Sequence, residues 1–400
     1  MRTARGVDRH GIVATTGNSQ RPYHVVVAGG GFAALEAVLG LRALAGSATR
    51  ISLVSPDPVF AYRPAATLDA FSDTAPRAFD LAAITAELGV KHYRTRVESV
   101  ATARKRVSLS SGGRLTYDAL VLATGARATV GVPGALTFRD QRDLPRFRDV
   151  LRELDRHHLD ALVFAVPSGV AWPLPLYELA MLSAAHARQQ GAQTKITLVS
   201  PEPRPLAAFG AEASELVAAE LADRGVRFLG SSVPGRLCGG GALSIQPGNP
   251  IKADRLVAVP QLRGASIAGV RANQWGFVAT DAVGRVEGMD DVYAAGDTTV
   301  YPIKHGGLAT QQADRIAHAI AAGLGLTPHE VKVKPTLEVR LVGGERPLRL
   351  RIELDGFAQA TAVTRARAGS DGRPTWTKVF GRYLTPYLEK HQIPPKPASR

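Results

Sequence analysis

Apolar runs and short polar breaks alternate in a regular order near the start of the chain. Tyr23–Ala28 is a mostly apolar run of strand length, which is typical of a strand buried on both faces of a parallel sheet. Three glycines follow at 29–31, then a helical apolar pattern over Phe32–Ala45 and a second strand-like run over Arg50–Val54. This order of strand, turn, helix and strand predicts a βαβ unit.

The same rhythm returns after residue 160. Ala161–Val166 is again an apolar run of strand length, a loop that contains proline follows, and Leu176–Arg188 has a helical pattern. Lys195–Ser200 reads KITLVS and is similar to ISLVS at 51–55, including the Ser-Pro step that ends each run. We interpret this similarity as an internal duplication of the α/β unit.

The other patterned segments complete these two units and then change in character. We expect a hairpin at Val107–Ser110 and Arg114–Tyr117, strands at Ala119–Ala123 and Val292–Ala295, and helices over 140–158, Ala211–Arg224 and Gly307–Leu324. From Val331 onward the pattern alternates at Thr336–Arg340 and Leu348–Leu354, which predicts antiparallel strands, and a helix is expected near Lys378–His391.

The glycine turn carries the strongest chemical signal. Gly29, Gly31 and Ala34 occupy the three small positions of a G-x-G-x-x-A pattern, with Phe32 and Ala33 between the last two. The first glycine permits a tight turn, the second lets the backbone approach a pyrophosphate, and the third small residue lets the helix pack on the strand. Phosphates then meet the N-terminus of the helix, where free N–H groups favour an anion. The turn therefore predicts a dinucleotide site.

The position that usually contacts a ribose is altered. An acidic residue normally follows the second strand of such a unit. Here Ser55 stands 24 residues after Gly31 (55 − 31), and Asp57 follows two residues later. A serine hydroxyl cannot act as a charged acceptor of two hydrogen bonds, so its contact is weaker. Both Ser55 and Asp57 remain candidates for the ribose contact.

Two further segments place small and polar residues directly after predicted strands, where a cofactor can be contacted. YDALVLATGAR contains Thr124 and Gly125 directly after a predicted strand. DDVYAAGD ends another strand at Gly296, which allows a close approach, and at Asp297, which can accept a hydrogen bond from a ribityl hydroxyl.

The helix after the second of these segments begins near Gly307 and Leu308. We expect its N-terminus to stabilise negative charge on the bound cofactor, and Lys304 adds a positive charge close by. An exposed loop lysine is the alternative interpretation of Lys304.

Taken together, the motifs resemble the flavoproteins with two dinucleotide-binding domains, the pyridine nucleotide–disulfide oxidoreductases, and within them the type II NADH dehydrogenases and sulfide:quinone reductases. GGGFAALEA, VSPDPVFAYRP, YDALVLATGA, VYAAGD and KHGGLATQQAD carry the resemblance, which covers residues 23–325. It implies FAD at the first site, with Arg63 and Pro64 near the isoalloxazine and Thr124-Gly125 near the adenosine side. It also implies a dehydrogenase that passes electrons to a quinone or another acceptor.

The fold that we expect is α/β, with two Rossmann-like dinucleotide-binding units, the first interrupted by the second, and a small α+β C-terminal domain. The expected parts are a flexible basic tail at 1–22, an FAD-binding unit at 23–140 and 285–325, a degenerate NAD-type unit at 141–284 and the C-terminal domain at 326–400.

The second unit departs from the family pattern in its turn. The turn reads Ala165-Val166-Pro167-Ser168-Gly169-Val170-Ala171-Trp172-Pro173, with Gly169 as its single glycine. Proline removes a donor, and Trp172 adds bulk where a pyrophosphate needs room. These changes disfavour NAD(P)H in the usual mode, although NAD(P)H stays a candidate cofactor.

Cys238 is the only cysteine of the chain, so neither an internal disulfide nor an intramolecular dithiol centre can form. Disulfide reductases need a cysteine pair beside the flavin, and sulfide:quinone reductases use cysteines to carry sulfur. Both chemistries are therefore disfavoured. No metal ligands are predicted.

Glu178, in LYELAML, is similar to the glutamate of the GVELA segment in type II NADH dehydrogenases, which lies near the flavin. A carboxylate there can relay protons to the flavin or to a quinone. An ion-paired glutamate on a helix is the alternative. Glu178 and Lys304 are the candidate catalytic residues.

The segment TWTKVFGRYLTPYLEK, at 375–390, places aromatic and apolar residues at helical spacing among Lys378, Arg382 and Lys390. This pattern suits a helix that lies on a membrane surface, a helix over the substrate entrance, or a helix at a dimer interface. Pro386 would kink such a helix.

Charge is concentrated at the ends of the chain. The net charge is +14, of which residues 331–400 contribute +8 (14 Lys and Arg against 6 Asp and Glu) and residues 1–22 contribute +3 (4 against 1). A basic end suggests an anionic partner such as a lipid surface. Nothing resembles a nucleic-acid module, a signal peptide or a membrane span.

We therefore expect an FAD-dependent oxidoreductase that passes electrons from NAD(P)H or another small reductant through the flavin to a quinone or similar acceptor. The alternative is a flavin-binding protein that has lost NAD(P)H oxidation and serves as a binding or regulatory module. A cytoplasmic monomer or homodimer is expected, with peripheral contact to the inner face of the membrane as a further option.

Overall fold

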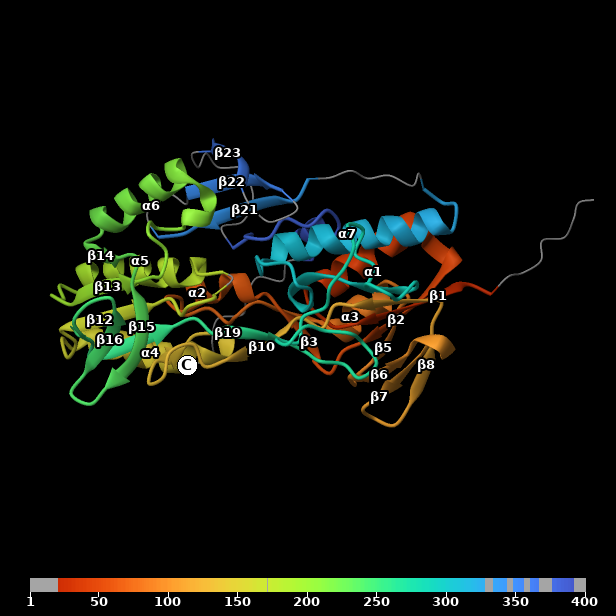
Figure 1. Cartoon of the computed structure of the whole chain (residues 1–400), viewed down its shortest axis with the longest axis horizontal. Helices are drawn as coiled ribbons and strands as arrows, with labels where there is room; N and C mark the ends of the chain where they lie inside the picture. Colours follow the sequence, from red (N-terminus) through yellow and green to blue (C-terminus); the bar gives the residue numbers. More distant parts are fainter. Residues whose placement is uncertain are drawn as a thin grey trace, which may run out of the picture.

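The structure of the chain is a computed structural model that describes residues 21–170, 172–327, 334–343, 348–355, 360–366 (backbone only) and 376–391. Two α/β units lie side by side along the long axis of the molecule, the first on the right of Figure 1 and the second on the left. The basic tail expected at 1–22 falls outside the described residues, apart from its last two positions.

The first unit is built on a five-stranded sheet in the order β20-β9-β1-β2-β5, in which every neighbouring pair is parallel. Its strands are β20 (Val292–Ala294), β9 (Ala119–Leu122), β1 (Tyr23–Ala28), β2 (Thr49–Val54) and β5 (Lys91–Tyr93). Central β1 is covered on both faces, and Val25, Val26, Val27 and Ala28 are at most 1% exposed. The apolar run therefore forms the buried parallel strand that its composition predicts.

Helices α1 (Phe32–Ala45) and α7 (Gly306–Gly323) cover one face of this sheet and pack on each other. Small residues permit this close approach, because a Cβ atom at Gly40 would lie 3.0 Å from the Cβ atom of Ala317. The other face packs on a three-stranded antiparallel sheet, β6 (Val97–Ala101), β7 (Arg106–Leu109) and β8 (Arg114–Thr116). The smaller elements of this unit are β3 (Val59–Ala61), α2 (Ala66–Asp69), β4 (Ala78–Asp80) and α3 (Leu81–Glu87).

The second unit repeats the architecture with a parallel sheet in the order β11-β18-β12-β13-β14. Its strands are β11 (Leu136–Thr137), β18 (Arg255–Ala258), β12 (Ala161–Ala165), β13 (Lys195–Val199) and β14 (Val226–Leu229), and its helices are α4 (Leu144–Asp155), α5 (Leu174–Gln189) and α6 (Ala211–Asp223). A small antiparallel sheet, β15 (Val233–Cys238), β16 (Ala242–Gln246) and β17 (Ile251–Lys252), completes it. The predicted α/β fold with two parallel-sheet units is confirmed.

The chain crosses between the units twice, and the two crossings form an antiparallel pair. β10 (Ala126–Thr129) leads out of the first unit and pairs with β19 (Gln261–Gly264), which leads back. Strand β11 belongs to the second sheet although it precedes residue 141, and Ile267 packs under the first sheet although it precedes residue 285. The insertion thus runs from about β11 to β18.

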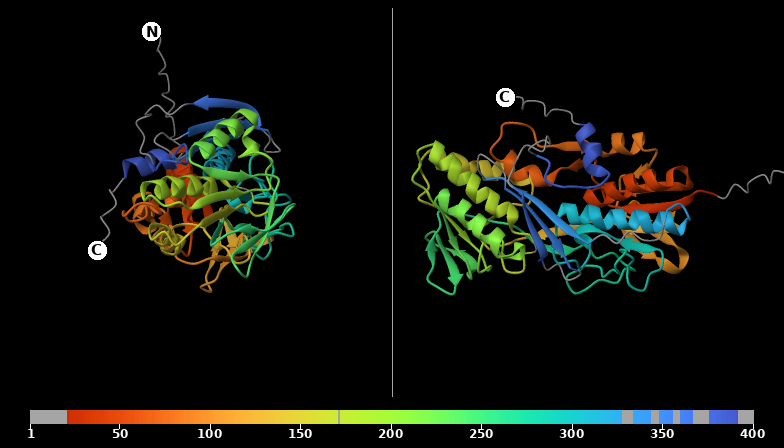
Figure 2. Two further views of the ribbon diagram at one scale, coloured as in Figure 1. Left: turned by 90° about the vertical axis from the view of Figure 1, so that its left-hand side faces the viewer. Right: turned by 90° about the horizontal axis from the view of Figure 1, so that it is seen from above.

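The C-terminal region holds the antiparallel strands β21 (Thr336–Leu341), β22 (Leu348–Leu354) and β23 (Ala360–Ala366) and the helix α8 (Leu384–Lys390). Leu337 and Val339 join the apolar core of the second unit, whereas α8 packs on α1 of the first (Figure 2). This region therefore touches both units.

The prediction of a helix near Lys378–His391 is wrong over its first half, because residues 376–383 are not helical. The backbone N–H groups of Lys378 and Val379 donate to the hydroxyl of Tyr62 instead. Trp376 and Val379 are buried in the core of the first unit. The amphipathic surface helix proposed for a membrane is therefore not formed over these residues. Within the described ranges, no helix combines the length and apolar character needed to cross a bilayer.

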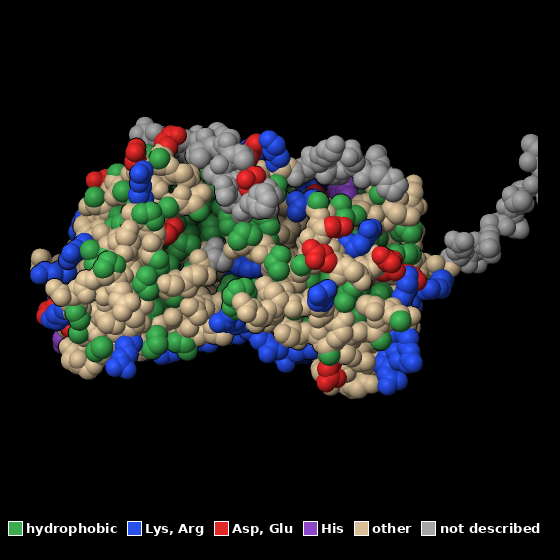
Figure 3. All heavy atoms as spheres, viewed as in Figure 1, with side chains coloured by type: hydrophobic (Ala, Val, Ile, Leu, Met, Phe, Trp, Pro, Cys, Tyr) green, Lys and Arg blue, Asp and Glu red, His purple; other side chains and the backbone are tan. Residues whose placement is uncertain are grey.

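Lys and Arg side chains gather along the lower edge of the face seen in Figure 3. Residues 331–400, which contribute +8 to the net charge, are described only in part. The anionic partner suggested by the basic C-terminal end therefore stays a prediction.

Candidate functional site

In the glycine turn after β1, Gly29 lies against the backbone of a neighbouring segment, whereas Gly31 faces open space. Gly29 has a φ of +131°, and a Cβ atom there would lie 2.1 Å from the carbonyl oxygen of Ala123. A Cβ atom on Gly31 would meet no described atom within 4 Å, so this side of the turn is open. The first helical bond of α1 runs from Leu35 N to Gly31 O. The N–H groups of the first turn, from Phe32 onward, therefore remain free for an anion.

The three segments with cofactor-like composition lie together at the carboxyl ends of β1, β9 and β20. The hydroxyl oxygens of Thr124 and Thr298 are 3.2 Å apart. A Cβ atom on Gly296 would lie 3.3 Å from the Cβ atom of Ala33 and 3.2 Å from that of Ala309. Segments 29–34, 124–125 and 296–297 thus converge, which is the arrangement that a bound dinucleotide requires.

Ser55 lies directly beneath the glycine turn. A Cβ atom on Gly30 would be 2.5 Å from its Oγ atom, and the side chain is 1% exposed. This Oγ atom has no hydrogen-bond partner among the described residues. Asp57, two residues further, is exposed. A buried hydroxyl without a partner is costly, so the orphaned Ser55 fits a site that a polar ligand completes.

Asp297 and Lys304 form the charged part of the site. Burial raises the pKa of Asp297, and the positive charges of Lys304 and Arg63 oppose that rise. Burial lowers the pKa of Lys304 to about 8, against the opposing effect of Asp297. The Lys304 ammonium donates to the carbonyl of Thr299 and lies 4.1 Å from the centre of the Phe277 ring. Lys304 is thus buried rather than an exposed loop lysine.

Arg63 occupies a more open position. Its side chain is 59% exposed, and its Nε atom lies 3.6 Å from Oδ2 of Asp140. It follows Tyr62, whose ring packs edge-on against Phe32 at the start of α1, with 5.4 Å between the ring centres. Arg63 therefore lies close to the glycine-turn helix, with a charged group directed to solvent.

The N-terminus of α7 is capped by its own histidine and covered by the C-terminal segment. Gly307 N donates to Nδ1 of His305, and burial lowers the pKa of His305 to about 4. A Cβ atom on Gly306 would lie 2.8 Å from Cγ2 of Val379. Leu308 points into the apolar core and is 2% exposed. Gly307 therefore marks the polar end of α7, whereas the Leu308 side chain packs inside.

Residues 376–384, here called the covering segment, are held over the first unit by two side chains. The Tyr62 hydroxyl accepts hydrogen bonds from Lys378 N (2.9 Å) and Val379 N (3.0 Å). The Glu36 carboxylate accepts from Tyr383 N (2.9 Å) and Leu384 N (2.8 Å). Burial raises the pKa of Glu36 to about 7. Sequence reasoning missed these anchors, because the helical spacing of the segment concealed its extended backbone.

Glu178 is part of a buried ion pair with the covering segment. Its Oε2 atom lies 2.7 Å from Nζ of Lys378 and accepts a second hydrogen bond, also 2.7 Å long, from Thr67. Its Oε1 atom accepts from Val342 N. Glu178 is therefore an ion-paired glutamate on a helix, the alternative interpretation given from the sequence. Its partner, Lys378, was not predicted.

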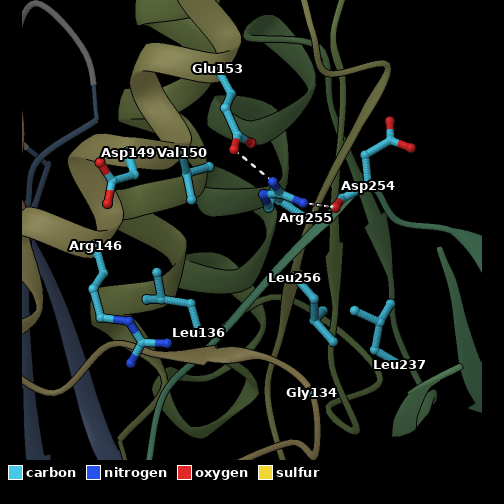
Figure 4. A pocket seen from close by; sticks show the side chains of 10 residues that line it. All are labelled: Gly134, Leu136, Arg146, Asp149, Val150, Glu153, Leu237, Asp254, Arg255 and Leu256. Atoms are coloured by element: carbon cyan, nitrogen blue, oxygen red, sulfur yellow. Dashed lines mark hydrogen bonds and ion pairs between the residues drawn. The ribbon is translucent and has the colours of Figure 1, made fainter. Parts of the chain in front are cut away.

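Cys238 and a pocket of the second unit both lie away from these segments. Cys238 is in β15 of the second unit, and its thiol lies 3.8 Å from the carbonyl of Arg236. The pocket, about 350 Å³ in volume, lies between α4 and β18 of the same unit and contains the Glu153–Arg255 ion pair (Figure 4). The described residues include no group of three or more possible metal ligands.

The family model described as pyridine nucleotide-disulphide oxidoreductase matches residues 23–323. An NADH dehydrogenase-like protein of Mycobacterium tuberculosis is 28% identical over 298 residues, which cover 68% of this chain and 72% of that protein. The sulfide-quinone reductase of Aquifex aeolicus is 27% identical over 191 residues, covering 45% of this chain and 43% of that one. The crystal structure of sulfide:quinone oxidoreductase from Aquifex aeolicus gives a TM-score of 0.77 at 20% identity and covers 92% of this chain and 90% of that chain.

Proposed function

Because the chain belongs to the pyridine nucleotide-disulphide oxidoreductase family, which combines FAD binding with a role for NAD(P)H, we propose that it is an FAD-dependent oxidoreductase that takes electrons from a small reductant and passes them to a quinone or similar acceptor. The convergence of segments 29–34, 124–125 and 296–297 carries this proposal. FAD needs a phosphate-binding turn and a ribityl contact on one sheet edge, and we assign both to these segments.

The residues of this chain fit FAD at the first unit. The N–H groups at the start of α1 would hold the pyrophosphate, Ser55 or Asp57 would contact the adenosine ribose, and Asp297 would accept from a ribityl hydroxyl. When bound, FAD supplies the two-electron redox chemistry that protein side chains lack. The positive end of α7 and the Lys304 ammonium then favour the negative charge that reduction creates.

Glu178, Lys378 and Thr67 provide a buried hydrogen-bonded group beside the covering segment. A carboxylate and an ammonium held 2.7 Å apart can share and pass a proton, and Thr67 bridges them. We assign to this trio the protonation of the acceptor. We propose Glu178 and Lys304 as the catalytic residues, as expected from the sequence.

The acceptor is assigned as a quinone or a similar molecule from the names of the relatives. One relative is named as a sulfide-quinone reductase and another as an NADH dehydrogenase-like protein. Cys238 is a single cysteine on the second unit and leaves no cysteine pair for sulfur chemistry. Quinone reduction is therefore proposed without sulfide as the donor.

The test begins with the purified protein. Its visible spectrum should show bound flavin, and mass spectrometry of the released cofactor should identify FAD. After anaerobic reduction by dithionite, addition of a water-soluble quinone should restore the oxidised spectrum. A protein that neither contains nor takes up FAD would overturn the proposal. Bound FAD that no quinone reoxidises would favour the alternative, a flavin-binding module without turnover.

A further inference from the structure

The second unit has a parallel sheet like that of the first, but its turn, its acidic residue and its contact with the first unit differ from what a dinucleotide site needs. We infer that this unit does not bind NAD(P)H, so the reductant of the proposed oxidoreductase is a two-electron donor without a dinucleotide. This inference rests on the proposed function and names its donor class.

The turn that should hold a pyrophosphate is too long. In the first unit, three residues (29–31) separate the end of β1 from the start of α1. In the second unit, eight residues (166–173) separate the end of β12 from the start of α5. A short glycine turn brings the phosphates onto the helix N-terminus, and the longer loop of the second unit departs from this geometry.

The start of α5 also offers few hydrogen-bond donors to an anion. Its second residue is Pro175, which has no N–H group. The next N–H group, that of Leu176, donates to the carbonyl of Pro173 at 2.9 Å. Of the first three residues of α5, only Leu174 keeps a free N–H group. By contrast, α1 offers the N–H groups of Phe32, Ala33 and Ala34.

The acid that should meet the ribose already has partners within the protein. Glu202 follows the second strand of this unit, β13, where such an acid is expected. Its Oε2 atom accepts from the hydroxyl of Tyr177 (2.8 Å) and from Ser200 Oγ (3.1 Å), and its Oε1 atom accepts from Ala207 N (3.1 Å). Burial raises the pKa of Glu202. Tyr177, which holds one side of this carboxylate, is fully buried and also accepts from Leu206 N, so the acid is bound within the protein on that side.

Trp172 fills the space between the two units. Its ring lies 5.9 Å from the Phe209 ring of the second unit and 4.8 Å from the His305 ring at the start of α7, measured between ring centres. A nicotinamide held by the second unit would have to pass this indole to reach the first unit. The indole stands in its way, so the obstruction and the altered turn act on the same ligand.

The first experiment uses the FAD-loaded protein under anaerobic conditions. Dithionite should bleach the flavin, which shows that the cofactor is bound and reducible. NADH or NADPH, at up to about 1 mM, the upper end of ordinary KM values, should leave the flavin oxidised. Isothermal calorimetry should show no saturable binding of either nucleotide. Saturable binding by the unmodified protein, or bleaching by either nucleotide, would overturn the inference. Absence of flavin would instead count against the proposed function.

A second experiment asks whether the named residues form the obstruction. The triple variant Trp172→Gly/Pro175→Ala/Tyr177→Phe removes the indole, restores an N–H group and frees Glu202. We expect it to gain saturable NADH binding, at least tenfold tighter than any signal from the unmodified protein, while its flavin stays bound. Trp275→Gly, at a 48% exposed tryptophan, is the matched control and should gain nothing. Equal signals from the triple variant and this control would contradict the assignment.

Discussion

Nζ of Lys378 lies 2.7 Å from Oε2 of Glu178, although 200 residues separate them, and the two side chains are only 6% and 2% exposed. The contact joins the covering segment to α5 of the second unit, and Thr67 of α2 donates to the same carboxylate oxygen. One buried ion pair therefore fastens together the C-terminal segment and both α/β units.

Replacing one member of this pair should destabilise the protein strongly. Lys378→Met leaves the Glu178 carboxylate buried without its counter-charge, which costs about 3–5 kcal/mol of unfolding free energy. Urea denaturation followed by circular dichroism measures the loss. The double variant that adds Glu178→Gln should recover part of it, because the uncompensated charge is then gone.

The matched control for that experiment is Lys252→Met. Lys252 pairs with Asp160 at 2.5 Å, but the two side chains are 57% and 80% exposed. An exposed pair contributes little to stability, because water and salt screen its charges. A loss at Lys378 no larger than the loss at Lys252 would show that the buried pair does not hold the covering segment.

Substitutions in the glycine turn should separate FAD binding from folding. Gly31→Ala adds a methyl group in open space, so the protein should fold normally but bind FAD at least tenfold more weakly, a change of about 1.4 kcal/mol. Gly29→Ala should impair folding as well, since its methyl group would meet the backbone of Ala123. FAD titration of the apoprotein and its melting temperature give the two readouts.

Gly323→Ala, at the end of α7, is the control for this series, because a Cβ atom there also meets no described atom within 4 Å. It should leave FAD binding unchanged, and its melting temperature should stay the same or rise slightly, because alanine favours a helix over glycine. If Gly31→Ala binds FAD as tightly as this control does, the phosphate-binding role of the turn is wrong.

Glu36 should make stability depend on pH. Burial raises its pKa from 4.5 to about 7. The folded protein therefore holds this proton more tightly than the unfolded chain, and the stability it contributes is complete below about pH 4.5. That stability is lost as the pH rises through about 7, and the full loss is about 3 kcal/mol.

Glu36→Gln removes this titration but keeps an oxygen to accept from the covering segment. The difference in unfolding free energy between the unmodified protein and the variant, measured from pH 4 to pH 8, should change in favour of the variant as the pH rises. A difference that stays constant over this range would mean that Glu36 does not titrate as its burial indicates.

Lys304 should influence the reduction potential of the bound flavin. Loss of its positive charge in Lys304→Met removes a stabilising contact for the reduced, more negative cofactor. The midpoint potential should become more negative by about 30 mV, which corresponds to about 1.4 kcal/mol for a two-electron couple. Spectroelectrochemistry measures it, with Lys252→Met as a control on the distant second unit. An unchanged potential would place Lys304 outside the influence of the cofactor.

Much of the first unit could be predicted because its signals are local. The strand–turn–helix order places Gly29 and Gly31 at a strand end, and Thr124 and Asp297 also follow apolar runs directly. Parallel strands of one sheet end on one edge, so sequence order alone brings these segments together. The family resemblance adds the identity of the cofactor.

The covering segment could not be predicted in the same way. Its apolar spacing fits a helix, but its backbone is fixed by Tyr62 and Glu36, more than 300 positions earlier in the chain. Glu178 likewise forms its ion pair with Lys378, and no local sequence pattern near either residue indicates this contact. Long-range hydrogen bonds of this kind override local propensity and leave no periodic trace.

Because the second unit is inserted within the first, the two units become complete at different times during synthesis on the ribosome. All strands of the second parallel sheet lie between residues 136 and 258, so the ribosome completes this sheet while the first still lacks β20 and α7. Domains emerging during synthesis fold as units, in the order in which they become complete. The inserted half can therefore mature first, and the FAD-binding half closes only once the final third of the chain has been made.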